Sequence, residues 1–305
     1  MAEMSSNTKK LIILTAGLLL FSLILGQIFG NSFPFGFLKN NTSFGGAKTF
    51  PVNDSFSKIE IESKTGNIRF YDSGSRNAKV VWSGSSGMKL SVATGGDTLE
   101  VSEKYKLPWF LRFGIHTGKS EIAVYLPQKN YEKLGIESDT GNIQIPSGLK
   151  FTRAEVETDT GSIDFQAAVS RELKIETDTG RINCTGVKPE NLEIASDTGS
   201  IYISSVRASD DIKLKTDTGR IALNNVTASD KLEIKSDTGS ISLERCDAED
   251  IDIKTDTGSV SGTLLSGKNF SARSQTGKVS IPESTFSGSC RIQSDTGSIT
   301  IRIEK

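Results

Sequence analysis

The sequence predicts an all-β fold, a parallel β-solenoid with coils of 19 or 20 residues that follows one N-terminal transmembrane helix. A motif of Ser or Thr, Asp, Thr, Gly, any residue and Ile recurs with few changes from residue 138 onward, and consecutive motif glycines are always 19 or 20 residues apart. A fixed period of this length is typical of stacked coils, none of which buries its apolar face alone. The glycines that we predict to form structural corners are Gly141, Gly161, Gly180, Gly199, Gly219, Gly239, Gly258, Gly277 and Gly297.

Each repeat contains short stretches with the period of a β-strand. In one repeat, Leu192 and Ile194 alternate with polar residues before the corner, and Ile201 and Ile203 do so after it. This alternation is typical of strands with one buried face. The sequence therefore predicts two main strands per coil.

The Asp-Thr-Gly triplet predicts a tight corner between these strands. We expect Gly199 to adopt a positive φ and the side chain of Asp197 to accept the Gly199 amide, as in an Asx-turn. A third, shorter side is predicted after the second strand, where Val206 and Ala208 are spaced to point inward.

The N-terminal region predicts a membrane anchor. Residues 1–10 end in Lys9 and Lys10 and are expected in the cytoplasm, and residues 11–29 form a charge-free apolar run long enough to cross a bilayer. The protein would then be a single-pass membrane protein whose C-terminal domain is extracytoplasmic. A cleaved signal peptide is the alternative, with Gly26 near the cleavage site, although secretory apolar regions are usually shorter. Residues 30–56 show no strand or helix period and are expected to be a flexible linker.

The region 57–133 is predicted to be an N-terminal β cap, and residues 134–305 the repeat domain. Residues 57–70 read as a further copy of the repeat, with Lys64 in place of the motif Asp. The strand-like runs that follow are less regular and are separated by Gly and Ser turns. Such a cap is needed because a solenoid would otherwise end in a bare sheet edge.

A loop within this cap is rich in aromatic residues. Trp109, Phe110, Leu111 and Phe113 lie in a stretch without strand alternation. They could close the end of the solenoid core, or they could form an exposed loop that contacts the membrane or a partner protein.

Composition excludes some classes of function. With 36 basic and 37 acidic residues the net charge is −1, so no global field favours nucleic acid. The three cysteines, Cys184, Cys246 and Cys290, occupy core positions without any Cys-x-x-Cys or Cys/His cluster, which favours buried small hydrophobes. The single His116 has no candidate ligand beside it, and the sequence contains no cofactor motif.

Outward positions of the repeats form two charged edges. At one end acidic residues gather, and these are candidate ligands for a hard cation or simply a solvated edge: Glu137, Glu157, Glu176, Asp139, Asp159 and Asp178. At the other end Lys215, Lys235, Lys254 and Arg273 are expected on successive coils about 4.8 Å apart. They could bind an anionic polymer of the envelope, or only neutralise the neighbouring aspartates.

Two motif similarities are set aside. Asp-Thr-Gly followed by Ser resembles the active-site turn of aspartic proteases, but their chemistry needs two aspartates facing each other in one cleft, and here the triplets stack in a column. The Thr-x-Thr spacing at Thr177 and Thr179 resembles the ladders of ice-binding solenoids. Strand alternation, however, turns the first Thr inward and leaves Asp178 exposed.

The repeated motif, the preceding strand-like segment 121–127 and the N-terminal anchor resemble the bacterial putative-adhesin β-strand-repeat family, and the layout is similar to its membrane-anchored LiaG-like members. The resemblance covers about residues 57–305. It implies a right-handed parallel β-solenoid outside the membrane of a Gram-positive bacterium, with a role connected to envelope stress, and it supplies no catalytic motif.

Three classes of function remain open. The first is a non-enzymatic binding or scaffold protein of the cell envelope. The second is a regulatory subunit that contacts another membrane protein through the linker and the aromatic loop. The third, an enzyme acting on polysaccharide, would need paired carboxylates and aromatic residues along one groove, and the acidic edge has no aromatic neighbour apart from the distant Tyr202.

Overall fold

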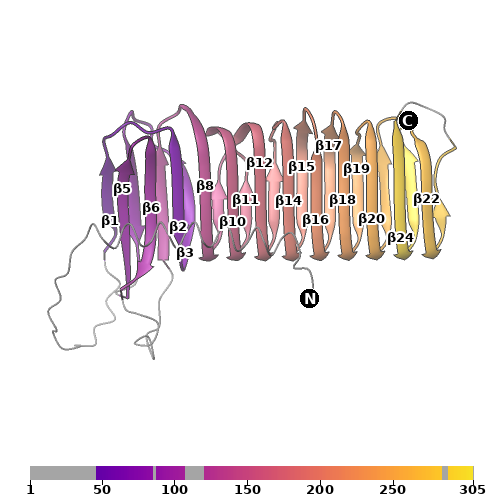
Figure 1. Cartoon of the computed structure of the whole chain (residues 1–305), viewed down its shortest axis with the longest axis horizontal. Coiled ribbons are helices and arrows are strands. Elements are labelled where there is room, and N and C mark those ends of the chain that lie inside the picture. Colours follow the sequence, from indigo (N-terminus) through magenta and orange to yellow (C-terminus); the bar gives the residue numbers. More distant parts are fainter. Residues whose placement is uncertain (1–45, 85–86, 107–119, 284–287, 305) are drawn as a thin grey trace, which may run out of the picture. The chain divides into compact units, whose positions relative to one another are not determined.

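The computed structural model describes residues 46–84, 87–106, 120–283 and 288–304, and all helix or strand elements in these ranges are β-strands. The strands form two sheets that stack rung after rung along one axis (Figure 1). A rung is one turn of the chain, with one strand in each sheet. The predicted all-β parallel solenoid is confirmed for this part of the chain.

The two sheets are named A and B, and their strands are given in spatial order. Sheet A consists of β1 (Lys48–Val52), β4 (Ala78–Ser83), β7 (Ser120–Leu126), β3 (Gly66–Asp72), β9 (Ile143–Ile145), β11 (Ile163–Phe165), β13 (Ile182–Thr185), β15 (Ile201–Ala208), β17 (Ile221–Ala228), β19 (Ile241–Cys246), β21 (Val260–Leu264), β25 (Ile299–Ile303) and β23 (Val279–Ser280). Sheet B consists of β22 (Asn269–Thr276), β24 (Ser289–Thr296), β20 (Asp250–Thr257), β18 (Lys231–Thr238), β16 (Ile212–Thr218), β14 (Asn191–Thr198), β12 (Ala168–Thr179), β10 (Lys150–Thr160), β8 (Asn130–Thr140), β2 (Lys58–Ser63), β6 (Thr98–Tyr105) and β5 (Met88–Gly95).

The rungs stack in register, so equivalent residues form columns. Leu192 pairs with Ile212, and Ile212 pairs with Leu232. These inward residues are at most 2% exposed and belong to one continuous apolar core between the sheets. Cys184, Cys246 and Cys290 are free and buried in this core, and burial raises the pKa of the Cys184 thiol to about 12. Their predicted role as small hydrophobes is confirmed.

The predicted third side of the coil is wrong. Val206 and Ala208 lie in the same strand as Ile201, and Val226 and Ala228 lie in the same strand as Ile221, so these rungs have no separate third face. The first pair returns to the inward side because Ser205 adopts a φ of 56°, which leaves both Ser204 and Ser205 on the outer side of the strand.

The corner glycines are required for a different reason than the one predicted. The amide of Gly199 donates to the carbonyl of Thr218 on the next rung at 2.9 Å, and not to Asp197. A Cβ on Gly199 would lie 1.7 Å from the carbonyl oxygen of Gly180 on the preceding rung. The backbones therefore approach each other so closely at the corner that only glycine fits.

The copy of the repeat at residues 57–70 stacks directly on the rung of Gly141. Strand β2 pairs with β8 in parallel, and β3 pairs with β9. The residues between β3 and β8 add further strands outside this rung, where β4 is antiparallel to both β1 and β7, and β5 is antiparallel to β6. The predicted irregular β cap therefore begins beyond β2 and β3, which themselves belong to the stack.

The last residues of the predicted linker 30–56 include strand β1, so the expectation of no strand is wrong for them. Strand β1 pairs with β4, and Val52 and Phe56 are only 5% and 3% exposed. The sequence concealed this strand because it contains Pro51 and is flanked by Gly and Asn, and proline is tolerated at a sheet edge. Residues 1–45 lie outside the described ranges, and so does the predicted membrane helix 11–29. No helix long and apolar enough to cross a bilayer occurs among the residues described.

The last two rungs are stacked in the reverse of their sequence order. Strand β24 lies between β20 and β22, and β25 lies between β21 and β23. The chain thus forms the outermost rung first and returns to insert its final rung inside it. This order places Arg291 beside Asp252, where sequence order would have placed Ser271.

Candidate functional site

The outer face of sheet A carries an open trough with a volume of about 550 Å³. It crosses β13, β15, β17, β19 and β21, which lie side by side along the stacking axis (Figure 1). The long direction of the trough is therefore perpendicular to the strands. Its lining comes from two columns of outward residues, one on each side of a column of inward-facing residues.

The first column contains one large side chain followed by small ones. Asn183 pairs with Tyr202, Tyr202 with Ala222, Ala222 with Ser242, and Ser242 with Ser261. Since Ala and Ser reach only a short distance from the sheet, the surface beyond the Tyr202 ring is hollow. Gly262 on β21 continues the middle column of the lining, opposite Leu243.

The second column carries polar groups along the other side of the trough: Thr185, Ser204, Asn224, Glu244 and Thr263. The amide of Asn224 donates to the Glu244 carboxylate at 2.7 Å. Hydroxyl, amide and carboxylate groups therefore face the hollow from one long side.

A line of left-handed residues runs beside this second column. Gly186 has a φ of 74°, and Ser205, Asn225 and Arg245 have φ values of 56°, 54° and 55°. This conformation costs most residues with a side chain about 1–2 kcal/mol, so Ser205 and Arg245 represent stored strain, while Asn225 is of a type that tolerates it better. Strain of this kind gathers at functional sites. Here it places two outward residues per rung at the rim of the trough.

The aromatic end of the trough is held by charged and polar neighbours. The guanidinium of Arg181 lies 5.3 Å from the centre of the Tyr202 ring, and Asn183 donates to Asp164 at 2.6 Å. A ring face, small apolar patches and hydrogen-bonding groups thus meet in one extended surface. Sequence reasoning missed this site. The available signal was the aromatic Tyr202 at an outward position where the following repeats carry Ala or Ser.

The predicted row of four cations on successive coils is wrong because of the reversed rungs. Lys215, Lys235 and Lys254 are neighbours, but Gln293 lies between Lys254 and Arg273. Two of the lysines also form ion pairs with neighbouring carboxylates. Lys215 lies 3.0 Å from Asp217, and Lys235 forms an ion pair with Glu233.

Those two ion pairs lower the pKa of the carboxylate in one case and raise the pKa of the lysine in the other, because each favours the charged form. Hydrogen bonds from Lys235 and Lys231 lower the pKa of Glu233 to about 2, and the hydrogen bond to Asp217 raises the pKa of Lys215. The lysines of this edge therefore neutralise nearby carboxylates, which weakens the case for a polyanion site there.

The acidic edge is assembled as predicted in its register. Glu137 pairs with Glu157, and Glu157 pairs with Glu176. Burial, followed by the charge of Glu176, raises the pKa of Glu157, and burial followed by the charge of Asp139 raises that of Asp159. Like charges thus crowd this edge, as the raised pKa values show, but within the described ranges these carboxylates do not converge on one point as metal ligands would. Whether they bind a cation stays a prediction.

The sequence matches a family model described as Toastrack DUF4097 over residues 56–210 and 199–305. The chain belongs to the Toastrack family. This match confirms the β-strand-repeat family recognised from the motif, while membership of the LiaG-like membrane-anchored group stays a prediction. No relative of this Toastrack chain is found among curated proteins.

Several crystal structures resemble this Toastrack chain. A putative adhesin from Bacteroides fragilis NCTC 9343 has 15% identity and a TM-score of 0.47, over 85% of this chain and 98% of that one. A putative adhesin from Parabacteroides distasonis ATCC 8503 has 10% identity and a TM-score of 0.48, over 84% and 97%. A putative lipid binding protein from the same organism has 13% identity and a TM-score of 0.45, over 85% and 97%. At these values the likeness carries no argument about what the Toastrack chain binds.

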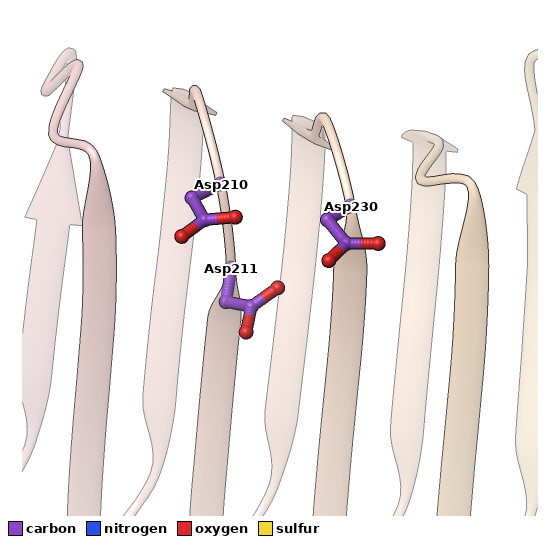
Figure 2. A group of neighbouring side chains, drawn as sticks. All are labelled: Asp210, Asp211 and Asp230. Atoms are coloured by element: carbon purple, nitrogen blue, oxygen red, sulfur yellow. The ribbon is translucent and has the colours of Figure 1, made fainter.

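Three carboxylates of the Toastrack chain gather at neighbouring turns, and Figure 2 shows Asp210 and Asp211 ahead of one sheet B strand and Asp230 ahead of the next. One oxygen from each lies within 4.8 Å of the others. Asp211, however, already accepts a backbone amide of the next rung at 3.0 Å, and Asp250 accepts the amide of Ser289 in the same way at 3.1 Å. The repeated contact shows that Asp211 and Asp250 stabilise the turns between rungs.

A buried carboxylate closes the N-terminal end of the stack, and sequence reasoning missed it. Glu103 is 0% exposed and accepts hydrogen bonds from the Trp82 indole at 2.9 Å, from the Ser63 hydroxyl at 3.1 Å and from the hydroxyl of Ser120. It also accepts the backbone amide of Thr65 at 3.1 Å. In some later rungs, such as those of Thr177 and Thr216, the equivalent hydroxyl donates to a glycine carbonyl of the preceding rung, and Glu103 takes the place of that carbonyl for Ser63.

The aromatic loop lies outside the described residues. Trp109, Phe110, Leu111, Phe113 and His116 all fall within residues 107–119. Their predicted contact with the core, the membrane or a partner stays a prediction.

Proposed function

We propose that this Toastrack chain is a non-enzymatic binding or scaffold protein of the bacterial cell envelope, whose solenoid holds an extended envelope polymer. The trough on the outer face of sheet A carries the proposal, because its volume of about 550 Å³ lies in the range of ligand sites. It also crosses five hydrogen-bonded strands, in register apart from one shift between β19 and β21, so its lining is held by rigid elements. An extended polymer fits a site that is long in one direction and open on its outer side.

The proposal includes the membrane anchor and the extracytoplasmic position of the solenoid. Residues 11–29 tether the chain, and Lys9 and Lys10 keep the short N-terminus in the cytoplasm. Protease added to intact cells stripped of their wall should then cut residues 57–305. Cutting only after lysis would contradict this orientation. An involvement in envelope stress follows from the family resemblance alone.

Sedimentation with isolated bacterial cell walls tests the binding role. The full-length protein in detergent micelles should sediment with the walls, and Ser242→Trp should leave it in the supernatant because Ser242 lies on the floor of the trough. Gln144→Trp is the matched control, since Gln144 is an outward residue of sheet A on β9, outside the trough. Wild-type protein that does not sediment, or Ser242→Trp that sediments fully, would contradict the proposal.

A further inference from the structure

We propose that the trough binds a neutral, linear glycan, with Tyr202 as the platform on which a sugar ring packs. This inference rests on the proposed binding function and names the class of polymer. It follows from the shape of the trough, from the chemistry of its rim and from its charge.

The polar rim excludes an acyl chain as the occupant. The groups facing the hollow include the hydroxyls of Thr185 and Ser204. A hydrocarbon lying there would cover these groups without giving them a hydrogen-bond partner, which costs about 1–3 kcal/mol for each group that becomes buried. A sugar chain instead offers hydroxyls that both donate and accept along its whole length.

The charge of the trough excludes an anionic polymer. Among the described residues that line it none is Lys or Arg, and Glu244 contributes a carboxylate. Arg245 follows Glu244 in the chain but forms an ion pair with Glu304 instead. Phosphate or carboxylate groups along this path would meet the Glu244 carboxylate and no lining cation, because the Arg181 guanidinium lies outside the lining, beside the Tyr202 ring at one end. A polymer without charge meets no such repulsion.

The backbone arrangement argues against an extended peptide. Peptides that add to a sheet do so at an edge strand, where main-chain groups are unpaired. The trough lies on the face of β15, β17 and β19, each of which has paired neighbours on both sides. Recognition at this face must therefore come from side chains.

The Tyr202 ring and the small floor match the two kinds of surface on a sugar. The C–H face of a pyranose packs on an aromatic ring, and its equatorial hydroxyls project from the edge of the sugar ring toward the rim. Beyond Tyr202 the floor is made by Ala222 and Ser242, which leaves room for further rings in line. From Asn183 to Ser261 the first column extends over four rung spacings, about 19 Å at about 4.8 Å each, so several sugars fit in a row.

Calorimetric titration of the full-length protein in detergent micelles tests the inference. The probes are chitohexaose, cellohexaose and cell-wall glycan strands freed of peptide and of anionic polymer. We expect at least one of them to bind. Tyr202→Ala should weaken that binding about tenfold, because aromatic residues carry a large share of the binding energy at such sites. Tyr202→Phe should bind like the wild type, Ser242→Trp should not bind, and Gln144→Trp should be unchanged.

The outcomes separate this inference from the proposed function. If the protein sediments with cell walls but binds none of the three glycans, or if Tyr202→Ala and Ser242→Trp bind them as well as the wild type, the glycan inference is wrong and the binding role stands. Titration with a nonionic detergent monomer, a short extended peptide and a polyphosphate probes the other occupants. Binding of one of these that is lost in Ser242→Trp would also overturn the inference.

Discussion

The close approach of backbones at the corners predicts that even an added methyl group is costly there. In Gly219→Ala the new Cβ would lie 1.8 Å from the carbonyl oxygen of Gly199, which is 1.6 Å short of the 3.4 Å at which ordinary contact begins. The two rungs are joined beside this point by hydrogen bonds from Gly199 to Thr218 and from Ile201 to Arg220, each 2.9 Å long. Opening the corner by the required distance breaks both.

The size of the effect follows from these contacts. Two lost backbone hydrogen bonds cost about 0.5–1.5 kcal/mol each, and the φ of 157° at Gly219 adds strain for alanine. We expect Gly219→Ala to lower the free energy of unfolding by about 3 kcal/mol. For a protein of this size that corresponds to a melting temperature lower by about 6–12 °C.

Gly186→Ala is the matched control. Gly186 has a φ of 74°, but a Cβ there would meet nothing within 4 Å. The change therefore adds the cost of the left-handed conformation, about 1–2 kcal/mol, without a steric conflict. Differential scanning calorimetry and urea titration of both variants give the comparison. Equal losses, or a smaller loss for Gly219→Ala, would show that conformation and not contact makes the corner glycines necessary.

Three further predictions concern buried polar groups and pH. Thr216→Val should lower the free energy of unfolding by about 1 kcal/mol, because the Thr216 hydroxyl donates to the Gly199 carbonyl at 3.2 Å. Thr255→Val should be neutral or stabilising, because the buried Thr255 hydroxyl has no partner. Urea titration measures both, and the opposite order would contradict this prediction. Glu103→Leu should cost at least about 3 kcal/mol, since it leaves several buried donors unpaired, and a loss below about 1 kcal/mol would show that the carboxylate is dispensable. Because the folded pKa of Glu157 is raised above its ordinary value of 4.5, its protonation stabilises the fold as pH falls through the folded pKa, and this gain becomes complete only below 4.5. Glu157→Gln should therefore raise the free energy of unfolding at pH 7 by about 0.5 kcal/mol. It should also reduce the increase in melting temperature as the pH is lowered from 7 to 4.5. A pH profile identical to that of the wild type would contradict this prediction.

The repeated units were predictable because their period and their alternation are written in the sequence. Thr177 was expected to point inward and Asp178 outward, and Thr177 is 1% exposed while Asp178 is exposed. The same register brings opposite charges of neighbouring rungs together, since Lys174 lies 3.4 Å from Glu155 and Lys213 lies 3.1 Å from Glu193.

The order of the rungs was not predictable in the same way. Every repeat carries the same corner and the same inward pattern. The motif alone therefore does not determine which rung stacks on which. The reversal at the C-terminal end instead depends on particular side chains. Cys290, Ile292 and Ile299 are at most 1% exposed in the inner rung, whereas Phe270 and Ala272 are only partly buried in the outer one. Placing the more apolar rung inside buries more apolar surface.

The candidate site was hidden because its residues look ordinary one at a time. Ala222, Ser242 and Ser261 are typical outward residues of a repeat, and only their adjacency beyond Tyr202 produces a hollow. The left-handed residues were also invisible, since Ser205 is not a residue type that predicts a positive φ. Such features arise from the neighbouring rungs and not from the local sequence.

The position of the trough agrees with the distribution of strain in the solenoid. Ser205, Asn225 and Arg245 each adopt a conformation that their side chains disfavour, and they can be held there only if the surrounding structure is firmly determined. This condition is met in the middle of the stack. Strands β15 and β17 resume in-register pairing after the kink, with Val206 opposite Val226 and Ala208 opposite Ala228. The rungs nearest the two ends, with antiparallel additions at one end and reversed order at the other, lack this continuity. A site that depends on a strained rim is therefore best supported where the trough lies.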